Sequence, residues 1–285
     1  MPVLRAVACE RFTGGLVTTA APPHGPWVAA AVALTNVPFV ELTFATLGQR
    51  PDLGRAMQSV PVTWPEFMLH DPVAGMFYAH LGGAFPDYQL VALAPDGSVV
   101  GRINSVPFSW DQTDDGLPDR GWDAVLEQAF TAGRVDGCNS ASLLEARVHP
   151  SYLGSGLSAT LLKAAAANAA SLGVHHLFGP VRPTMKCEEP RVPIGEYADR
   201  RRDDGLPFDP WLRTHVRLGG RVVRVCPASM TISGTLTEWR TWTGMELLTS
   251  GMWEVPGALV PIHVSVEKDH AVYVEPNVWV HHRLP

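Results

Sequence analysis

Glu145-Ala-Arg-Val-His-Pro-Ser-Tyr-Leu-Gly-Ser-Gly-Leu-Ser158 is the stretch of this sequence that decides its fold. A strand is predicted over 143–148, a Gly-x-Gly turn follows it, and a helix rich in alanine and leucine is predicted over 157–172. Gly154 and Gly156 allow a tight turn because they carry no Cβ. The first amides of a helix lack partners within the helix and lie at the positive end of its dipole. The turn is therefore predicted to bind an anion such as a diphosphate.

Two common phosphate-binding patterns do not fit this turn. A P-loop requires Lys and then Ser or Thr after its second glycine, whereas Leu157-Ser158 follows Gly156. A dinucleotide-binding loop requires three glycines and an acid about 20 residues further on. Only two glycines are present, and the candidate acids Glu188 and Glu189 come too late. The sequence therefore predicts a site for another phosphorylated cofactor.

The segment resembles the acyl-CoA loop of the GNAT N-acyltransferases, where Val-x-Pro-x-x-Arg/Gln-Gly-x-Gly-x-Gly/Ala ends the fourth strand and opens the long helix. A second stretch, 209–223, resembles the family's Asn-x-x-(x)-x-x-Tyr-x-x-Leu-Gly-Phe helix and the strand after it. The two stretches come in the family's order, and a predicted fifth strand over 174–181 separates them. The residues that match the first motif are Val148, Pro150, Gly154 and Gly156.

The resemblance implies an α/β fold with a mixed, mostly antiparallel central sheet, flanked by helices and splayed between its fourth and fifth strands. It covers roughly residues 36–235. Residues 1–35 are predicted to be an N-terminal extension, and 36–285 a single domain with extra C-terminal strands. A long connection over 181–208 lies beside the implied acyl site, which favours a lid or an acceptor-binding loop.

The resemblance also implies acetyl-CoA or another acyl-CoA as co-substrate, without a metal. Leu153 stands where the family usually has Arg or Gln, and Ser158 where it has Gly or Ala. The missing cation removes one charge-assisted contact to the diphosphate of CoA. Backbone amides make most of the contacts to this group in the family, so CoA binding is expected to be weakened rather than abolished. The residues expected at the cofactor are Ala146, Val148, Leu153, Gly154, Ser155, Gly156, Leu157 and Ser158.

The implied reaction is direct attack of an amine on the thioester, which needs a polarised carbonyl, a base and an acid. Backbone N–H near Val148 is expected to polarise the carbonyl. Glu145 is the candidate base because it is a carboxylate in an otherwise apolar strand, and it should face the side opposite to Val148. The alternative is a carboxylate on an outer face that is either solvated or a neighbour of Arg147.

His215 is the candidate acid, because it stands where many members of the family carry a tyrosine. An imidazole with an unperturbed pKa of about 6.5 exchanges protons at physiological pH. The alternative is a surface or packing histidine. Arg182 and Lys186 follow the fifth strand, where they are candidates for contacting a diphosphate or an acceptor carboxylate, and ordinary surface charge is the alternative.

Charge, hydrophobic runs and cysteine content argue against several classes of protein. A net charge of −6 and a pI near 6.0 argue against nucleic-acid binding. The apolar run over 27–34 is too short to span a membrane and lacks the features of a signal peptide. Scattered cysteines predict free thiols in a reducing cytoplasm. They are Cys9, Cys138, Cys187 and Cys226.

The predicted function is transfer of an acyl group, most simply acetyl, from acyl-CoA to a small-molecule amine. One alternative is a non-catalytic acyl-CoA-binding or sensor protein on the same fold. Another is acyl transfer from a carrier protein or to a hydroxyl group. A homodimer through the C-terminal strands, predicted over 260–266 and 271–280, is a further expectation.

Overall fold

The computed structural model describes residues 30–34, 37–131 and 138–285. Most of the predicted N-terminal extension, including a possible strand over 3–8, lies outside these residues. The part that is described joins the sheet, because Ala30–Leu34 pairs with the strand after it. The sheet therefore begins ahead of the predicted boundary at residue 36.

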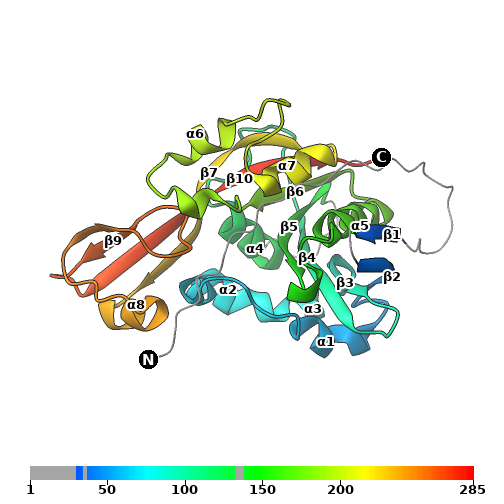
Figure 1. Ribbon diagram of the computed structural model, residues 1–285, viewed down its shortest axis with the longest axis horizontal. Helices are drawn as coiled ribbons and strands as arrows, with labels where there is room; N and C mark the ends of the chain where they lie inside the picture. The colour runs from blue at the N-terminus through cyan, green and yellow to red at the C-terminus, as the bar shows by residue number, and fades with distance from the viewer. Residues whose placement is uncertain (1–29, 35–36, 132–137) are drawn as a thin grey trace.

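A ten-stranded sheet organises the molecule, in the order β1-β2-β3-β4-β5-β6-β10-β9-β8, with β7 paired to β10 (Figure 1). Among the described residues β5 and β6 are parallel and the other ladders are antiparallel. The predicted mixed, mostly antiparallel sheet is confirmed. Its strands are β1 (Ala30–Leu34), β2 (Val37–Thr46), β3 (Gln89–Leu93), β4 (Val99–Phe108), β5 (Ser140–Val148), β6 (His176–Val181), β7 (Arg221–Gly234), β8 (Gly251–Trp253), β9 (Ile262–Ser265) and β10 (His270–Arg283).

The sheet opens between β5 and β6. Residues 140–142 pair with 176–178, and the two strands then separate although β5 continues to Val148 and β6 to Val181. β6 pairs on its other side with the C-terminal half of β10, from Val181 opposite Val278 to His176 opposite Arg283. β5 pairs on its other side with β4 along its whole length. The opening therefore lies where the sequence predicts the splay.

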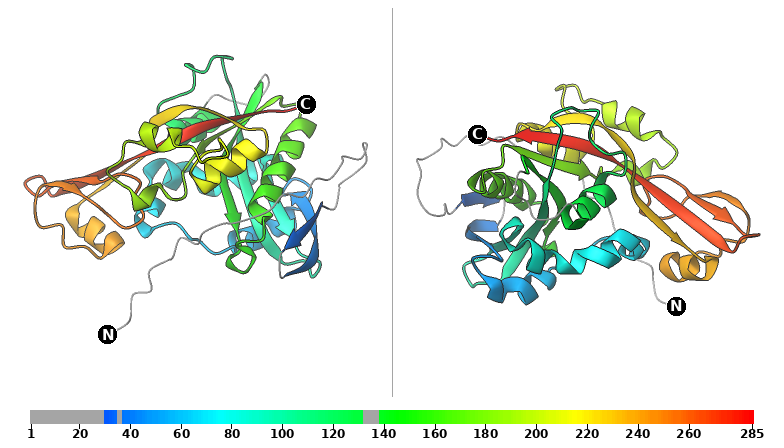
Figure 2. Two further views of the ribbon diagram at one scale, coloured as in Figure 1. Left: turned by 45° about the horizontal axis from the view of Figure 1, so that its top comes forward. Right: turned by 180° about the vertical axis from the view of Figure 1, so that it is seen from behind.

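Helices cover both faces of the sheet. α5 packs Leu161 and Leu162 against Ile103 of β4, whereas α4 packs Val125 against Phe178 of β6 on the opposite face. α5 and α7 lie toward the viewer in Figure 1, and α4 is in front in the right-hand view of Figure 2. The helices are α1 (Gly54–Gln58), α2 (Pro72–Phe77), α3 (Leu81–Ala84), α4 (Gly121–Thr131), α5 (Leu157–Ser171), α6 (Ile194–Asp199), α7 (Pro210–Arg217) and α8 (Leu236–Thr243).

The helices start and stop for local reasons that the sequence shows. The Asp209 carboxylate accepts hydrogen bonds from the amides of Trp211 and Leu212 and so caps α7, which begins at Pro210. α5 ends before Gly173, whose φ of 79° is left-handed. Within the described residues no helix is both long and apolar enough to cross a bilayer.

The C-terminal strands form an arm that projects beyond the helix-covered sheet (Figure 1, left). β7 and β10 are each 14 residues long, and α8, β8 and β9 lie between them in the sequence. Phe67 packs under the arm, with its ring 5.7 Å from that of Trp239 and 5.3 Å from that of Tyr273. The extra C-terminal strands thus extend the sheet, while the homodimer through them stays a prediction.

The connection over 181–208 is more ordered than its composition suggests. It contains the 3₁₀ turn Lys186–Glu188 and α6, and it buries Tyr197 and Ala198. The Tyr197 hydroxyl donates to Asp209, the N-cap of α7. The segment is therefore packed against the body of the protein, and its predicted role as a lid or acceptor-binding loop stays a prediction.

Two buried carboxyl groups come together where α2, α4 and β7 join. Asp71 caps α2 by accepting from the Ala74 amide at 2.7 Å, and Asp123 accepts from the Thr231 amide at 3.2 Å. The second oxygen of each group is buried and has no partner that satisfies hydrogen-bond geometry in the described chain. Burial raises the pKa of both groups, and with the charge of Asp71 it raises the pKa of Asp123 to about 8. At neutral pH the pair therefore holds a proton.

Asp123→Asn is expected to make stability less dependent on pH. A carboxyl whose folded pKa of about 8 exceeds its ordinary 3.8 contributes stability that is complete at low pH and is lost as pH rises through the folded value. The amide keeps a donor toward Asp71 but does not titrate. Thermal unfolding from about pH 5 to about pH 9 measures the effect. The Tm of the variant minus the Tm of the wild type should increase as the pH rises. A difference in Tm that does not change with pH would contradict the shared proton.

Candidate active site

The glycine turn at the start of α5 has the geometry expected of an anion site. Gly154 and Gly156 have φ values of 77° and 79°, which residues with a Cβ rarely adopt. The Leu157 amide donates to the Ser155 hydroxyl at 3.2 Å. In the described chain the amides of Gly154, Gly156 and Ser158 have no intramolecular acceptor. These donors at the positive end of a 15-residue helix support the predicted diphosphate site.

Gly156→Asp is expected to weaken acetyl-CoA binding severely, because it places a carboxylate beside the predicted diphosphate and strains the turn. Gly173→Asp is the matched control, since Gly173 has the same φ of 79° at the other end of α5. Calorimetry on both folded variants separates charge at the site from backbone strain. Equal affinities for the two variants would rule out this turn as the cofactor site.

β5 presents different side chains to the two faces of the sheet. Val148 and Ala146 pack in the cluster formed with α5, whereas Glu145 points to the opposite face, toward Trp64 and Tyr78. Glu145 and Val148 therefore face opposite sides, as predicted. Leu153 is 62% exposed in the loop before α5, so the position that usually carries a cation in the family lies at the surface.

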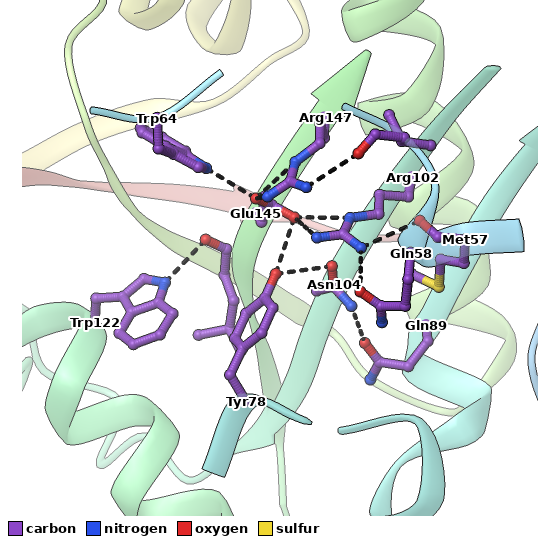
Figure 3. Close-up of polar contacts among 12 residues, drawn as sticks. Met57, Gln58, Trp64, Tyr78, Gln89, Arg102, Asn104, Trp122, Glu145 and Arg147 are labelled. Atoms are coloured by element: carbon purple, nitrogen blue, oxygen red, sulfur yellow. Dashed lines mark hydrogen bonds and ion pairs between the residues drawn. The ribbon is translucent and has the colours of Figure 1, made fainter. Parts of the chain in front are cut away.

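Glu145 lies at the centre of a buried polar cluster (Figure 3). One carboxylate oxygen accepts from Trp64 Nε1 at 2.9 Å and from two nitrogens of Arg147. The other accepts from the Tyr78 hydroxyl at 2.9 Å and from two nitrogens of Arg102, the shorter at 2.7 Å. The side chains of Glu145, Arg102 and Arg147 are 5%, 2% and 8% exposed. Glu145 is therefore neither solvated nor on an outer face, although it does pair with its neighbour Arg147, as the alternative expected.

Strand register explains how the cluster forms. Arg102 lies opposite Arg147 in the β4–β5 ladder, and Asn104 lies opposite Glu145. Two like charges placed directly opposite would repel each other, and the carboxylate beside them offsets this repulsion. Burial alone would raise the pKa of Glu145, but the charges of Arg102 and Arg147 outweigh it and hold that pKa below its ordinary value.

The cluster also ties the segment over 57–78 onto the sheet. Arg102 donates to the Met57 carbonyl at 3.2 Å and to the Gln58 side chain at 2.9 Å, and Arg147 donates to the Val60 carbonyl at 3.2 Å. Trp64 and Tyr78 reach Glu145 from the same segment. Because the pKa of Glu145 is lowered and both of its oxygens accept hydrogen bonds, its charge holds the segment over 57–78 on the sheet. Its role as the base stays a prediction, and it requires Glu145 to release one of these donors.

Glu145→Gln tests the anchoring role. Removing the charge leaves two buried guanidinium groups without their counter-ion, which typically costs about 3–5 kcal/mol. Asp114→Asn is the control, because it removes an exposed ion pair with Arg221 that should contribute about 1 kcal/mol or less. Urea unfolding measures both free energies. A Glu145 variant as stable as the control variant would show that the cluster does not anchor the segment.

His215 lies inside the protein, with 1% of its surface exposed. Its Nδ1 is 2.9 Å from Nε2 of His282 on β10. Burial, followed by the charge of His282, lowers the pKa of His215 to about 3. The expected pKa near 6.5 is therefore wrong, and the surface alternative is wrong as well. An acid would need the imidazolium form, which is not populated at neutral pH.

Arg182 and Lys186 are held by groups of the protein itself. Arg182 pairs with Glu275 on β10 at 2.9 Å and also donates to the Gly257 carbonyl. Lys186 is fully buried, and its Nζ donates to the carbonyls of Glu189 and Leu259 at 2.7 and 2.6 Å. Both cations join the connection over 181–208 to the arm. The alternative of plain surface charge is wrong, because most donors of both groups are used within the protein.

The structure adds residues to the site that the sequence analysis did not select. They come from the segment before β3, from β4 and from β10, and none belongs to either motif. The sequence contained one indication of Arg102 and Asn104. They are two residues apart in a predicted strand, as Glu145 and Arg147 are in the strand that follows, so each pair lies on one face. The added residues are Trp64, Tyr78, Arg102, Asn104 and His282.

Comparisons with known proteins agree with this architecture. No protein-family model matches the sequence. An arginine N-acetyltransferase of Aspergillus versicolor, avaD, is 35% identical over 271 residues, which cover 84% of this chain and 93% of that protein. The loading GNATL domain of CurA from Lyngbya majuscula is 17% identical and covers 86% of this chain and 97% of the domain, with a TM-score of 0.53. The GphF GNAT-like decarboxylase, solved in complex with isobutyryl-CoA, is 18% identical. The match covers 86% of this chain and 99% of the decarboxylase chain, with a TM-score of 0.49.

Proposed function

The chain belongs to the N-acetyltransferases of the GNAT superfamily, and on this premise we propose that it transfers an acetyl group from acetyl-CoA to the α-amine of arginine or a similar cationic amino acid. The observation that carries this proposal is the 35% identity, over 84% of the chain, to an arginine N-acetyltransferase. The α-amine is the proposed nucleophile because a guanidinium group, with a pKa above about 12, stays protonated.

The cofactor half of the proposed site uses the opening of the sheet. The diphosphate binds the amides over 154–158 at the start of α5, and the pantetheine arm enters where β5 and β6 separate. Residues 140–142 form the closed end of that opening. Backbone N–H groups of β5 near Val148 polarise the thioester carbonyl. In the reaction the C–N bond forms, the C–S bond breaks, the amine loses a proton and the thiolate gains one.

The acceptor half of the proposed site lies on the opposite face, beside Glu145, Trp64 and Tyr78. A cationic acceptor is proposed by similarity to the arginine N-acetyltransferase. The local charges do not favour a cation, because Arg102 and Arg147 outnumber the single carboxylate of Glu145. Trp64 and Tyr78 are uncharged donors, so an ammonium group can replace one of them at Glu145 more readily than it can replace an arginine. If Glu145 takes the amine proton, it does so after that exchange. Arg182 and Lys186 are not proposed as ligands, since both are already paired.

A panel of acceptors with acetyl-CoA tests the proposal. Arginine, agmatine and citrulline separate the features of the substrate, because agmatine lacks the carboxylate and citrulline lacks the cationic charge. Release of free thiol, together with mass spectrometry of the product, should show acetylation of arginine at its α-amine. Citrulline should react at least about 10-fold more slowly, since it loses a charge-assisted contact of about 1.5–3 kcal/mol.

The same panel separates the proposal from its alternatives. A sensor protein would bind acetyl-CoA and release no thiol with any acceptor. A carrier-protein donor would give turnover only when the acyl group is presented on the carrier. Hydroxyl acylation would yield an ester that hydroxylamine cleaves readily, whereas an amide resists it. Any of these three results would replace the proposal.

A further inference from the structure

The indole of Trp64 connects the two strands that separate. Its Nε1 donates a hydrogen bond to Glu145 on β5 at 2.9 Å (Figure 3). The guanidinium group of Arg182, the residue that follows β6, lies over the Trp64 ring, 5.6 Å from the ring centroid. Both contacts lie beyond the last paired residues of the two strands, which are 142 on β5 and 178 on β6. Trp64 therefore reaches across the opening of the sheet.

The strand register places the two contacts at nearly the same level of the opening. Residues 140–142 pair with 176–178, and the same spacing would set Glu145 opposite Val181 if the ladder continued. The bulge in β5 just before Glu145 moves this correspondence by one residue. Arg182 is the residue after Val181. Glu145 and Arg182 therefore stand on the two sides of the gap, and the indole spans the distance between them.

The surroundings of Trp64 hold the indole in this position. Trp64 is half-buried and packs against the hydrophobic cluster on the α4 face of the sheet. The next residue, Pro65, packs closely on Gly257, where a Cβ would lie 2.6 Å from Pro65 Cγ. The carbonyl of Gly257 also accepts a hydrogen bond from Arg182. The indole is thus fixed on the face opposite α5 and the glycine turn.

This inference rests on the proposed function, in which an acyl-CoA enters the opening from the α5 face. The diphosphate is proposed at 154–158, next to the end of β5 at Val148, so the pantetheine arm runs from there toward the closed end at 140–142. The acyl group is the far end of that arm. Glu145 lies between Val148 and the closed end, which is the level where the indole of Trp64 crosses the gap.

We propose that Trp64 is the wall that limits the length of the acyl group, so that this protein takes short acyl-CoA donors, acetyl above all. An indole is a large and rigid side chain. Its N–H and its ring face are both engaged here, so a longer acyl chain can displace it only by breaking the contacts with Glu145 and Arg182. Tyr78 is then the donor that an ammonium group replaces at Glu145.

Calorimetry with acetyl-, propionyl- and butyryl-CoA tests the wall in the wild-type protein. These thioesters differ by one methylene at each step. Butyryl-CoA should bind at least about 5-fold more weakly than acetyl-CoA, because methylenes that are forced against packed side chains are unfavourable. Affinity that stays constant or increases along the series would overturn the proposal, since it would show that nothing stops the chain at this length.

Trp64→Ala should reverse the order of affinities. With the wall removed, each additional buried methylene can raise affinity by about 4-fold, so butyryl-CoA should bind up to about 15-fold more tightly than acetyl-CoA. Trp253→Ala is the matched control. Trp253 is also half-buried, packs against the same cluster and donates its Nε1–H to a backbone carbonyl, but it lies on β8 in the arm. The control variant should keep the wild-type order.

Trp64→Phe keeps the test decisive if the alanine variant does not fold. A phenyl ring preserves the packing but is shorter than an indole, so the ratio of the acetyl-CoA and butyryl-CoA affinities should be smaller than in the wild type. Thiol release with the same three donors and a working acceptor should follow the same order in each variant. A Trp64 variant whose preference among the donors equals that of Trp253→Ala would contradict the proposal.

The outcomes separate this inference from the function on which it rests. If the wild-type protein acetylates arginine and the preference among the donors does not depend on Trp64, only the wall is wrong. If the preference changes as expected but arginine is not acetylated, the wall is supported and the proposed acceptor is wrong. If the wild-type protein binds none of the three thioesters, both proposals are wrong.

Discussion

A carboxylate buried between two arginines is the interaction that holds the covering segment over 57–78 on the sheet. Glu145 accepts hydrogen bonds from Arg102 and Arg147 on adjacent strands, while Trp64 and Tyr78 reach it from the covering segment. Such a cluster contributes little net stability when complete, but losing one member leaves an uncompensated charge in the protein interior. The cost of that loss holds the segment over 57–78 in one position above the sheet.

A different constraint acts on the other face. β5 and β6 separate after residues 142 and 178, so the facing backbone edges cannot pair with each other. β10 pairs with the other edge of β6 and β4 with the other edge of β5, so within the described chain no strand pairs with the two edges that face the gap. Buried backbone groups need partners, and a bound cofactor arm is one way to supply them. The buried cluster around Glu145 and the open edge of the sheet thus meet along β5.

The sequence predicted the elements that local rules determine. The glycine turn, the α5 helix and the capped start of α7 depend on residues close in the chain, and they appear as expected. The strand at the end of the stretch 209–223 is longer than the motif indicates, because β7 continues to Gly234 as part of the arm. Short helices such as α2 and α6 were missed, since tertiary packing rather than helical periodicity stabilises them.

Side-chain roles were harder to predict, because they depend on contacts between distant parts of the chain. Glu145 was identified from its strand, but its six donor contacts include Trp64, which lies 81 residues away. His215 was identified from its motif, but its pKa is set by burial and by His282, 67 residues away. Arg182 and Lys186 were considered as ligands because the arm that engages them could not be placed from the sequence.

β10 links these long-range effects. Its C-terminal half supplies His282 and pairs with β6, and its middle supplies Glu275, which holds Arg182 at the end of β6. Its N-terminal half pairs with β9 and β7 in the arm. A single strand therefore connects the arm, the connection over 181–208 and the histidine pair of His215 and His282.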